Sequence, residues 1–379
     1  MEPEYLDFNA TTPLDPRVFE VMKEWYLGPP ANAGSRTHVY GQRAKEAVEN
    51  ARKQVADVID ARPEEIYFTS GATESNNIAI LGLTALGEKT GRKHIISTAI
   101  EHKAVLEPLE EMKRRGFEVD LAPVTTGGFV EVDSIERLLR PDTLLVSVMH
   151  SNNETGILQP IKEVGEIVSN FDAFFHTDAA QTFGKEIVEL REAKCDFISI
   201  SGHKIFGPQG IGALFVNRKS GKKRPIEPIA FGGGQERGLR AGTIPVPLTV
   251  GLGEAARLAI SECKSRRKAS QEIRKMILKT LASVEHEVNG DQARCQCHVI
   301  NVRFPDVDSE ALMMALKDQL AISNGSACTT SNYAPSHVLV AMGFDDDDAN
   351  EAVRLSWSSQ PLDQFDKIAE KIASTQTSF

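Results

Sequence analysis

One lysine on a glycine-punctuated turn has a setting that favours covalent chemistry. Lys204 lies within Ser201–Gly210, and apolar runs at 197–200 and 211–216 stand on either side of that stretch. Most lysines are solvated surface charges. A lysine held where two buried strands meet is partly desolvated, which lowers the pKa of an ammonium group and frees a nucleophilic amine. Schiff-base chemistry needs such an amine.

An acidic residue at the end of another apolar run is a candidate partner for this chemistry. Asp178 follows the run at 173–176. A carboxylate at the end of a buried strand is costly unless it is paired. The protonated pyridine nitrogen of pyridoxal phosphate is one such partner, and an N-cap role for the next helix is the alternative. Because Lys204 also follows an apolar strand, we favour the cofactor interpretation.

Three more strand-to-helix turns carry polar residues. The stretch 69–77 combines glycine with hydroxyls, so its backbone N–H groups and helix dipole predict a phosphate site, with a plain capping turn as the alternative. His102 follows the run at 94–97 and is placed to stack on an aromatic cofactor, although a lone histidine is usually structural. The stretch 150–156 either offers amides to a ligand or is an ordinary polar loop.

The second candidate nucleophile is a cysteine. Cys328 lies among small polar residues between Ser323 and Ser331. A buried structural cysteine normally has apolar neighbours. The polar setting therefore predicts an accessible thiol, whose reactivity depends on its thiolate fraction.

The elements that position these residues alternate along the chain. Short apolar strands alternate with helices, which predicts an α/β fold around a mostly parallel sheet whose ligands gather at the carboxyl ends of the strands. A charged helical stretch at about 253–285 opens a smaller α+β part. The expected strands of the larger part are 65–69, 94–97, 117–122, 143–148, 173–176, 197–200 and 211–216, and its expected helices include 43–60, 103–115 and 161–169.

Composition narrows the class of protein. The chain has 379 residues and a net charge of −10, which argues against direct nucleic-acid binding. No signal sequence or membrane-length apolar run is evident, and five cysteines form no disulfide framework, so a reducing cytoplasm is expected. No metal is expected, because 295–298 lacks a second ligand cluster. The dinucleotide-like 251–256 follows prolines rather than a clean strand, and no G-x-S-x-G motif is present.

Taken together, these motifs resemble the cysteine desulfurases, pyridoxal-phosphate enzymes of the aminotransferase-like fold, in the branch with a Ser-Ala-Cys-Thr loop. The resemblance covers nearly the whole chain and rests on these stretches in order: 5–13, 69–77, 101–102, 150–156, 176–181, 201–212, 232–243 and 325–329. It implies a large domain at 16–252 with a seven-stranded sheet. It also implies an N-terminal arm at 1–15 associated with a small domain at 253–379, which carries a mobile cysteine loop at about 323–336.

The resemblance implies a role for each residue that matches the family motifs. Lys204 would form the Schiff base and move the Cα proton, Asp178 would pair with the pyridine nitrogen, and His102 would stack on the ring and act as acid or base. The other cofactor contacts that it implies are Gln181 at the ring hydroxyl, Asn153, and a phosphate set of Ala72, Thr73, Ser201, His203 and, from a second subunit, Thr243. The implied substrate-binding residues are Asn32, Asn153 and Arg354.

The implied reaction converts L-cysteine to L-alanine and leaves a persulfide on Cys328. A homodimer and a sulfur-acceptor protein are the implied partners. Iron–sulfur cluster assembly, tRNA thiolation and DNA phosphorothioation are possible destinations of the sulfur. The departure from the family pattern at 355–359 favours a dedicated pathway such as DNA sulfur modification.

Two other functions stay open at this point. A related lyase acting on selenocysteine or cysteine sulfinate would not need the thiol of Cys328. A non-catalytic scaffold with the same fold is the second alternative, and the presence of Lys204, Asp178, His102 and Cys328 argues against it.

Overall fold

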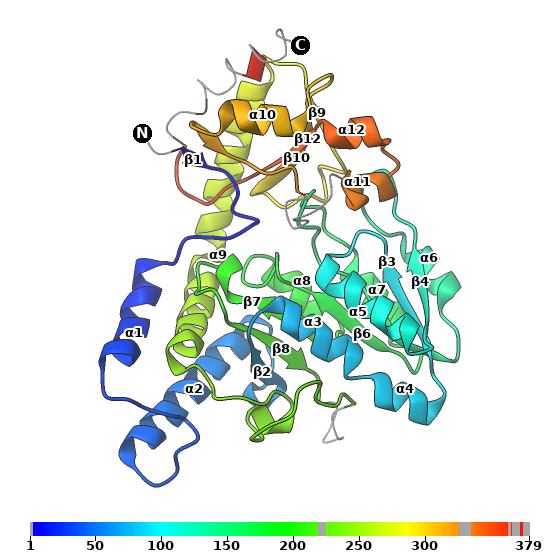
Figure 1. Ribbon diagram of the computed structural model, residues 1–379. Coiled ribbons are helices and arrows are strands. Elements are labelled where there is room, and N and C mark those ends of the chain that lie inside the picture. Colours follow the sequence, from blue (N-terminus) through cyan, green and yellow to red (C-terminus); the bar gives the residue numbers. More distant parts are fainter. Residues whose placement is uncertain (1–2, 219–224, 326–334, 363–364, 366–371, 374–379) are drawn as a thin grey trace.

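The computed structural model describes residues 3–218, 225–325, 335–362, 365 and 372–373. Its centre is a seven-stranded sheet of order β2-β8-β7-β6-β5-β3-β4 (Figure 1). Strand β8 is antiparallel to both of its neighbours, and the other pairs are parallel. The strands are β2 (Ile66–Thr69), β3 (His94–Thr98), β4 (Glu118–Ala122), β5 (Thr143–Ser147), β6 (Phe174–Asp178), β7 (Phe197–Ser201) and β8 (Gly212–Val216). The predicted α/β class, its mostly parallel sheet and all seven strands are confirmed.

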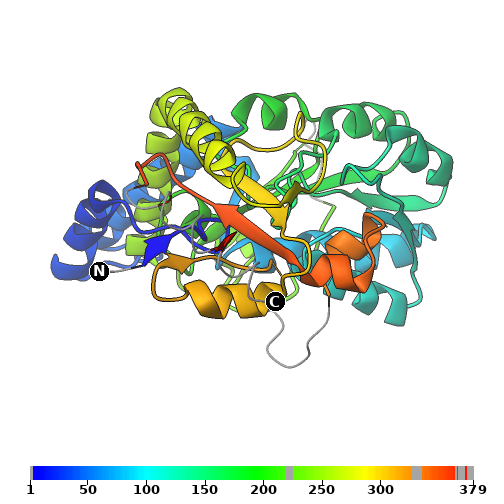
Figure 2. The ribbon, with the colours of Figure 1, turned by 90° about the horizontal axis from the view of Figure 1, so that it is seen from above.

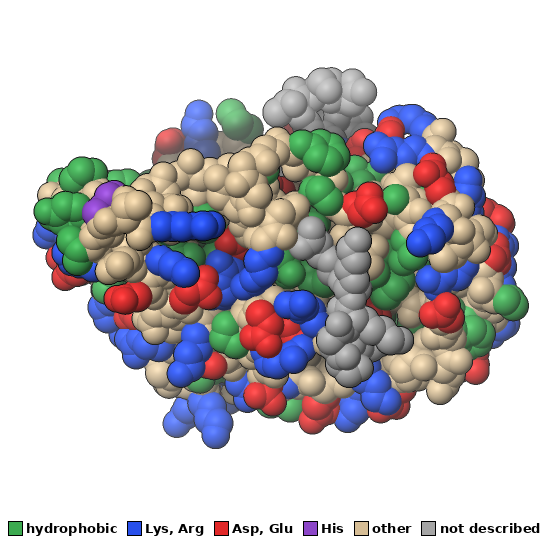
Figure 3. All heavy atoms as spheres, turned by 90° about the horizontal axis from the view of Figure 1, so that it is seen from below, with side chains coloured by type: hydrophobic (Ala, Val, Ile, Leu, Met, Phe, Trp, Pro, Cys, Tyr) green, Lys and Arg blue, Asp and Glu red, His purple; other side chains and the backbone are tan. Residues whose placement is uncertain are grey.

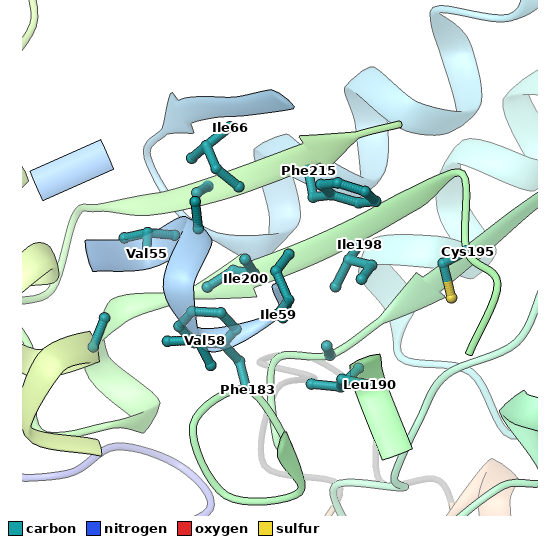
Figure 4. Packing of buried hydrophobic residues seen from close by; sticks show 14 of the residues in the cluster. Val55, Val58, Ile59, Ile66, Phe183, Leu190, Cys195, Ile198, Ile200 and Phe215 are labelled. Carbon is teal, nitrogen blue, oxygen red and sulfur yellow. The ribbon is translucent and has the colours of Figure 1, made fainter. Parts of the chain in front are cut away.

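Helices cover both faces of this sheet because side chains alternate between its faces. Ile198 and Phe215 belong to one apolar cluster, and the next residues along, Phe197 and Leu214, belong to another. The first cluster includes buried residues of α1 (Pro16–Leu27), α2 (Val39–Val58), α6 (Val132–Leu138), α7 (Ile161–Val168) and α8 (Ile187–Glu192) (Figure 4). The second includes residues of α3 (Ala72–Leu81), α4 (Thr84–Thr90) and α5 (Lys103–Arg114).

A smaller part lies over the carboxyl edge of this sheet (Figures 1 and 2). Its three-stranded antiparallel sheet has the order β12-β10-β9, and its apolar cluster is separate from those of the large sheet. Its elements are β9 (Glu287–Val288), β10 (Val299–Arg303), α10 (Ser309–Leu316), β11 (Leu320–Ala321), α11 (His337–Ala341), α12 (Asp346–Asn350) and β12 (Ala352–Ser356).

The N-terminal arm reaches this smaller part. Strand β1 (Glu4–Tyr5) pairs in parallel with β11, and Asp7 forms a bridge with Ser356 of β12. Helix α1 then begins after Asp15, its N-cap, whose side chain accepts a hydrogen bond from the backbone N–H of Arg17. The division into an arm, a large domain and a small domain stays a prediction.

One helix boundary was predicted wrongly. The helix expected at about 253 begins seven residues earlier, because α9 runs over Val246–Leu281. Pro247 fits its first turn, where a missing N–H removes no helical hydrogen bond. The early residues of α9, such as Leu252, pack on the large sheet, whereas Ile273 and Leu281 pack on the small one. The helix thus joins the two parts, and the dinucleotide-like stretch lies inside it. No described helix is long and apolar enough to cross a membrane.

Candidate active site

A cavity of about 630 Å³ lies where strand ends of the large sheet meet the arm and the small part. We call it the main cavity. It brings together most of the residues that the sequence singles out. Those that line it are Ala72, Thr73, His102, Asn153, Asp178, Gln181, Ser201, His203, Lys204 and Arg354.

The amine of Lys204 is directed toward the arm. The residue sits in a short 3-10 helix, Gly202–Lys204, between β7 and β8. Its Nζ donates to the backbone oxygen of Asn9 at 2.5 Å and to that of Ala10 at 2.7 Å. The arm is tied to the same turn, because the Thr12 hydroxyl donates to the backbone oxygen of His203. These contacts hold the amine at the wall of the main cavity.

The carboxylate of Asp178 ends strand β6 and is fixed from two sides. Asn76 of α3 donates from Nδ2 to Asp178 Oδ2 at 2.7 Å, and the backbone N–H of Ala180 donates to Oδ1 at 2.9 Å. Asp178 is 6% exposed. Both donors fix the position of the carboxyl group at the end of β6. A carboxyl group held in this way can pair with a cationic group of a ligand.

Two further polar groups face the same space. Burial lowers the pKa of His102 below 6.5, which makes the imidazole neutral at pH 7, and its Nδ1 accepts from the N–H of Ala104 in α5. Gln181 donates from Nε2 to the backbone oxygen of Asn9. Its Oε1 is buried without a hydrogen-bond partner among the described residues. An orphaned buried oxygen of this kind can accept a hydrogen bond from a ligand.

The amino end of α3 lies at one edge of the cavity, where its backbone N–H groups can bind an anion. Its first residues, Ala72 and Thr73, line the cavity together with Ser201 and His203. The turn packs closely on β8, since a Cβ on Gly212 would lie 2.6 Å from the Cα of Gly71. The first N–H groups of a helix have no partner within the helix and attract an anion. Burial lowers the pKa of His203 to about 4, so its ring interacts with an anion as a neutral hydrogen-bond donor.

Arg354 of β12 reaches the cavity from the small part. Its side chain donates to the backbone oxygen of Asn153 at 2.9 Å and forms an ion pair with Asp7 of the arm at 2.5 Å. Its Nε is buried without a partner among the described residues. A ligand carboxylate at Arg354 would therefore share the guanidinium with Asp7.

Two candidate residues stand apart from this cavity, and a third lies outside the described residues. Asn32 and Thr243 are exposed and do not line it, and the Asn32 side chain accepts from the N–H of Gly34. Cys328 lies outside the described residues. The chain just before it does reach the site, since Ser323 and Gly325 line the main cavity.

Sequence reasoning assigned no role to Asn9, Asp7 or Asn76. Asn9 is 1% exposed, its backbone oxygen accepts from both Lys204 and Gln181, and its Nδ2 donates to the backbone oxygen of Asn153. All three lie in stretches on which the family resemblance rests, 5–13 and 69–77. A helical period of four, which puts Asn76 on the face of Ala72, is the signal that could have found one of them.

The comparisons with known proteins match nearly the whole chain. Residues 4–359 match the family model described as aminotransferase class-V. A mitochondrial cysteine desulfurase of Saccharomyces cerevisiae is 48% identical over 353 residues, which cover 93% of this chain and 70% of that protein. Two solved structures are similar. DndA from Streptomyces lividans has a TM-score of 0.82 at 49% identity, over 92% of this chain and 98% of that one. A NifS-like protein has a TM-score of 0.91 at 35% identity, over 100% of both chains.

Proposed function

The chain belongs to the aminotransferase class-V family and, within it, to the cysteine desulfurases, and on that premise we propose that it takes sulfur from L-cysteine onto Cys328. The observation that carries the proposal is one cavity lined by the amine of Lys204, the carboxylate of Asp178 and Gly325. Only two residues, Ser326 and Ala327, separate Gly325 from Cys328. Covalent geometry keeps the Cα of Cys328 within about 11 Å of that wall.

The residues of the main cavity fit pyridoxal 5'-phosphate, the cofactor that the family implies. The amino end of α3 with Ser201 and His203 suits its phosphate, and the orphaned Gln181 Oε1 suits the ring hydroxyl. Asp178 would hold the pyridine nitrogen, and Lys204 offers the amine for the aldehyde. When bound, the cofactor withdraws electrons from the Cα of the substrate.

The remaining chemistry belongs to side chains of this protein. Arg354 binds the substrate carboxylate, and the Lys204 amine takes up the Cα proton. After the sulfur has left, the Cα and the Cβ of the product each receive a proton, one of them originating from the thiols. The neutral His102 imidazole is available to accept or donate a proton beside them. The Cys328 thiolate attacks the substrate sulfur, so that the carbon–sulfur bond breaks and a sulfur–sulfur bond forms. L-Cysteine and the thiol of Cys328 thus yield L-alanine and a Cys328 persulfide.

The described cysteines support Cys328 as the sulfur carrier. Burial raises the pKa of Cys195, Cys263, Cys295 and Cys297, the last to about 11, and none of these four thiols lines the main cavity. A thiol must ionise to attack sulfur. Their protonated state at neutral pH leaves Cys328 as the candidate.

The test compares Cys328→Ala with Cys297→Ala in the cofactor-loaded enzyme. We expect Cys328→Ala to reduce alanine formation from L-cysteine on the order of 10³-fold, since removal of a nucleophile has effects of at least that size. Cys297→Ala should keep wild-type turnover, because its thiol lies away from the main cavity. Mass spectrometry of the Cys328 peptide after a single turnover should show one added sulfur atom. Full turnover by Cys328→Ala would refute the persulfide mechanism and favour the lyase alternative.

The partners of this reaction are also proposals. We expect a homodimer, which would bring Thr243 and Asn32 to a neighbouring site. Exposed apolar side chains, among them Leu27 at 77% and Phe231 at 87%, support a covered surface. Such side chains gather around the connection between α1 and α2, at the left of Figure 3. The acceptor protein, the pathway and a cytoplasmic location stay predictions, and the absence of direct nucleic-acid binding stays an expectation.

A further inference from the structure

We propose that Glu154 is a positioning residue that anchors both ends of the segment carrying Cys328, and so sets how the thiol meets the substrate. The inference rests on the proposed function, because it concerns the step in which sulfur leaves L-cysteine. Glu154 belongs to the turn after Asn153, and its side chain does not line the main cavity.

The first anchor lies on the C-terminal side of the segment that carries Cys328. Ser336, which begins helix α11, donates from its hydroxyl to Glu154 Oε2 at 2.5 Å. The same hydroxyl accepts from the N–H of Leu339 as the N-cap of α11. A hydroxyl that donates to a buried carboxylate forms a short, strong hydrogen bond. Ser336 and the start of α11 are thereby fixed to Glu154.

The second anchor lies on the N-terminal side of the same segment. Gly325 lies so close to the same carboxylate that a Cβ at this position would be 2.9 Å from Glu154 Oε2. Its φ of +83° is a conformation that glycine adopts readily and other residues avoid. Its N–H donates to the hydroxyl of Ser323, which also lines the main cavity. Gly325 is thus held against Glu154 at the wall of the main cavity.

Glu154 is itself held rigidly. It is 3% exposed, and its backbone N–H donates to Asn152 Oδ1 at 2.8 Å. Asn152 in turn donates to the backbone oxygen of Ile100, on the strand side of His102. The carboxylate is therefore fixed relative to His102 and Asn153. One residue links the geometry of the cavity wall to both ends of the cysteine-bearing segment.

The test separates thiol positioning from the chemistry of Lys204. Exchange of the Cα hydrogen of L-alanine in heavy water requires Lys204 and the cofactor but no thiol. For Glu154→Ala, we expect kcat with L-cysteine to fall about 10- to 100-fold, the effect of a misplaced reacting group. Alanine exchange should stay at the wild-type rate, and iodoacetamide should label Cys328 faster.

Conservative variants supply the controls. Glu154→Gln keeps an acceptor oxygen for Ser336 and should retain more turnover than Glu154→Ala. Ser336→Ala removes the first anchor and leaves the carboxylate in place, so it should also lower kcat without slowing exchange. Thr155→Val removes a hydrogen bond to Asn152 within the same turn and should keep wild-type kcat and labelling.

The outcomes distinguish two kinds of failure. If the wild-type enzyme makes no alanine from L-cysteine, the proposed function fails. If it does, but Glu154→Ala keeps its kcat, the positioning role is refuted. Parallel losses of turnover and exchange in Glu154→Ala would also refute it, since they would mean a general defect of the cavity.

Discussion

The main cavity and a second cavity behind the arm contain similar residue types, yet their arrangement differs. The second, which we call the rear cavity, measures about 70 Å³ and is lined by Lys185, His298, Cys263 and Cys297, among others. The arm separates the two cavities. Asp7, Asn9, Ala10 and Thr11 line the main cavity, whereas Phe8 and Thr12 line the rear one.

If a lowered lysine pKa were the only criterion, the rear cavity would be taken for the active site. Burial, followed by the charge of Lys204, lowers the pKa of Lys185 to about 7. Its Nζ donates to His298 Nε2 at 3.1 Å, and the carboxylate of Glu186 nearby is paired with Arg267. In the main cavity the amine of Lys204 shares its space with Asp178, a helix N-terminus and the orphaned oxygen of Gln181. A ligand site therefore needs several polar groups that converge on one space, and not a single perturbed lysine.

The largest effect should come from replacing each of the two lysines separately. We expect Lys204→Ala to lower desulfuration about 10²- to 10⁴-fold, because it removes the group that moves the proton. Lys185→Met should stay within about twofold, since it changes a separate cavity. Alanine production from L-cysteine measures both. Equal losses in the two variants would remove the functional distinction between the cavities.

A smaller effect should follow from removing one of the two hydrogen bonds that hold the Asp178 carboxyl group. Asn76→Leu keeps the volume of the side chain but removes the donor to Asp178 Oδ2. A hydrogen bond to a charged group contributes about 1.5–3 kcal/mol, so we expect activity to fall about 10- to 100-fold. Spectrophotometric titration with pyridoxal phosphate should show weaker binding.

The matched control for this variant is in the small part. Asn289 is 3% exposed and donates to Asn301 Oδ1 at 2.7 Å, so Asn289→Leu removes a comparable buried hydrogen bond. It should lower stability and leave cofactor binding unchanged. Weaker cofactor binding in the control as well would mean that Asn76 acts only through general stability.

The sequence predicted the cavity residues that follow strands of the large sheet better than those that come from the arm and from helix α3. Lys204, Asp178 and His102 follow apolar strands, and residues at the carboxyl ends of parallel strands meet at one edge. The rule therefore brings them together without knowledge of the fold. Asn76 was missed because its partner Asp178 lies 102 residues further along the chain, and the helical period that puts Asn76 on the face of Ala72 does not identify that partner.

The arm was harder to predict for a different reason. Asn9 acts mainly through its backbone oxygen, which accepts from Lys204 and Gln181, and a backbone group leaves no trace in residue type. Asp7 meets Arg354 only because β1 pairs with β11. Strands of two residues, such as β1 and β11, are too short to show a recognisable pattern in the sequence. The second-subunit role of Thr243 depends on a neighbouring chain, and it stays a prediction, as does the substrate-binding role of Asn32.

The smallest effect should be a dependence of stability on pH that belongs to the rear cavity. The pKa of Lys185 is about 7 in the folded protein and about 10.4 in an unfolded chain. Between these values the unfolded state binds more protons, so the contribution of Lys185 makes the free energy of unfolding rise with pH. Below pH 7 both states are protonated, and the destabilisation by the buried charge is at its full size. Lys185→Met removes this contribution.

The variant should therefore be more stable than the wild type near pH 7, and its advantage should shrink toward pH 10. Urea denaturation of both proteins at pH 7, 8 and 9 measures the difference, in which the titration of shared cysteines cancels. An advantage that is constant with pH would mean that the Lys185 amine is solvated in the folded protein. In that case only the convergent groups around Lys204 would distinguish the main cavity from the rear one.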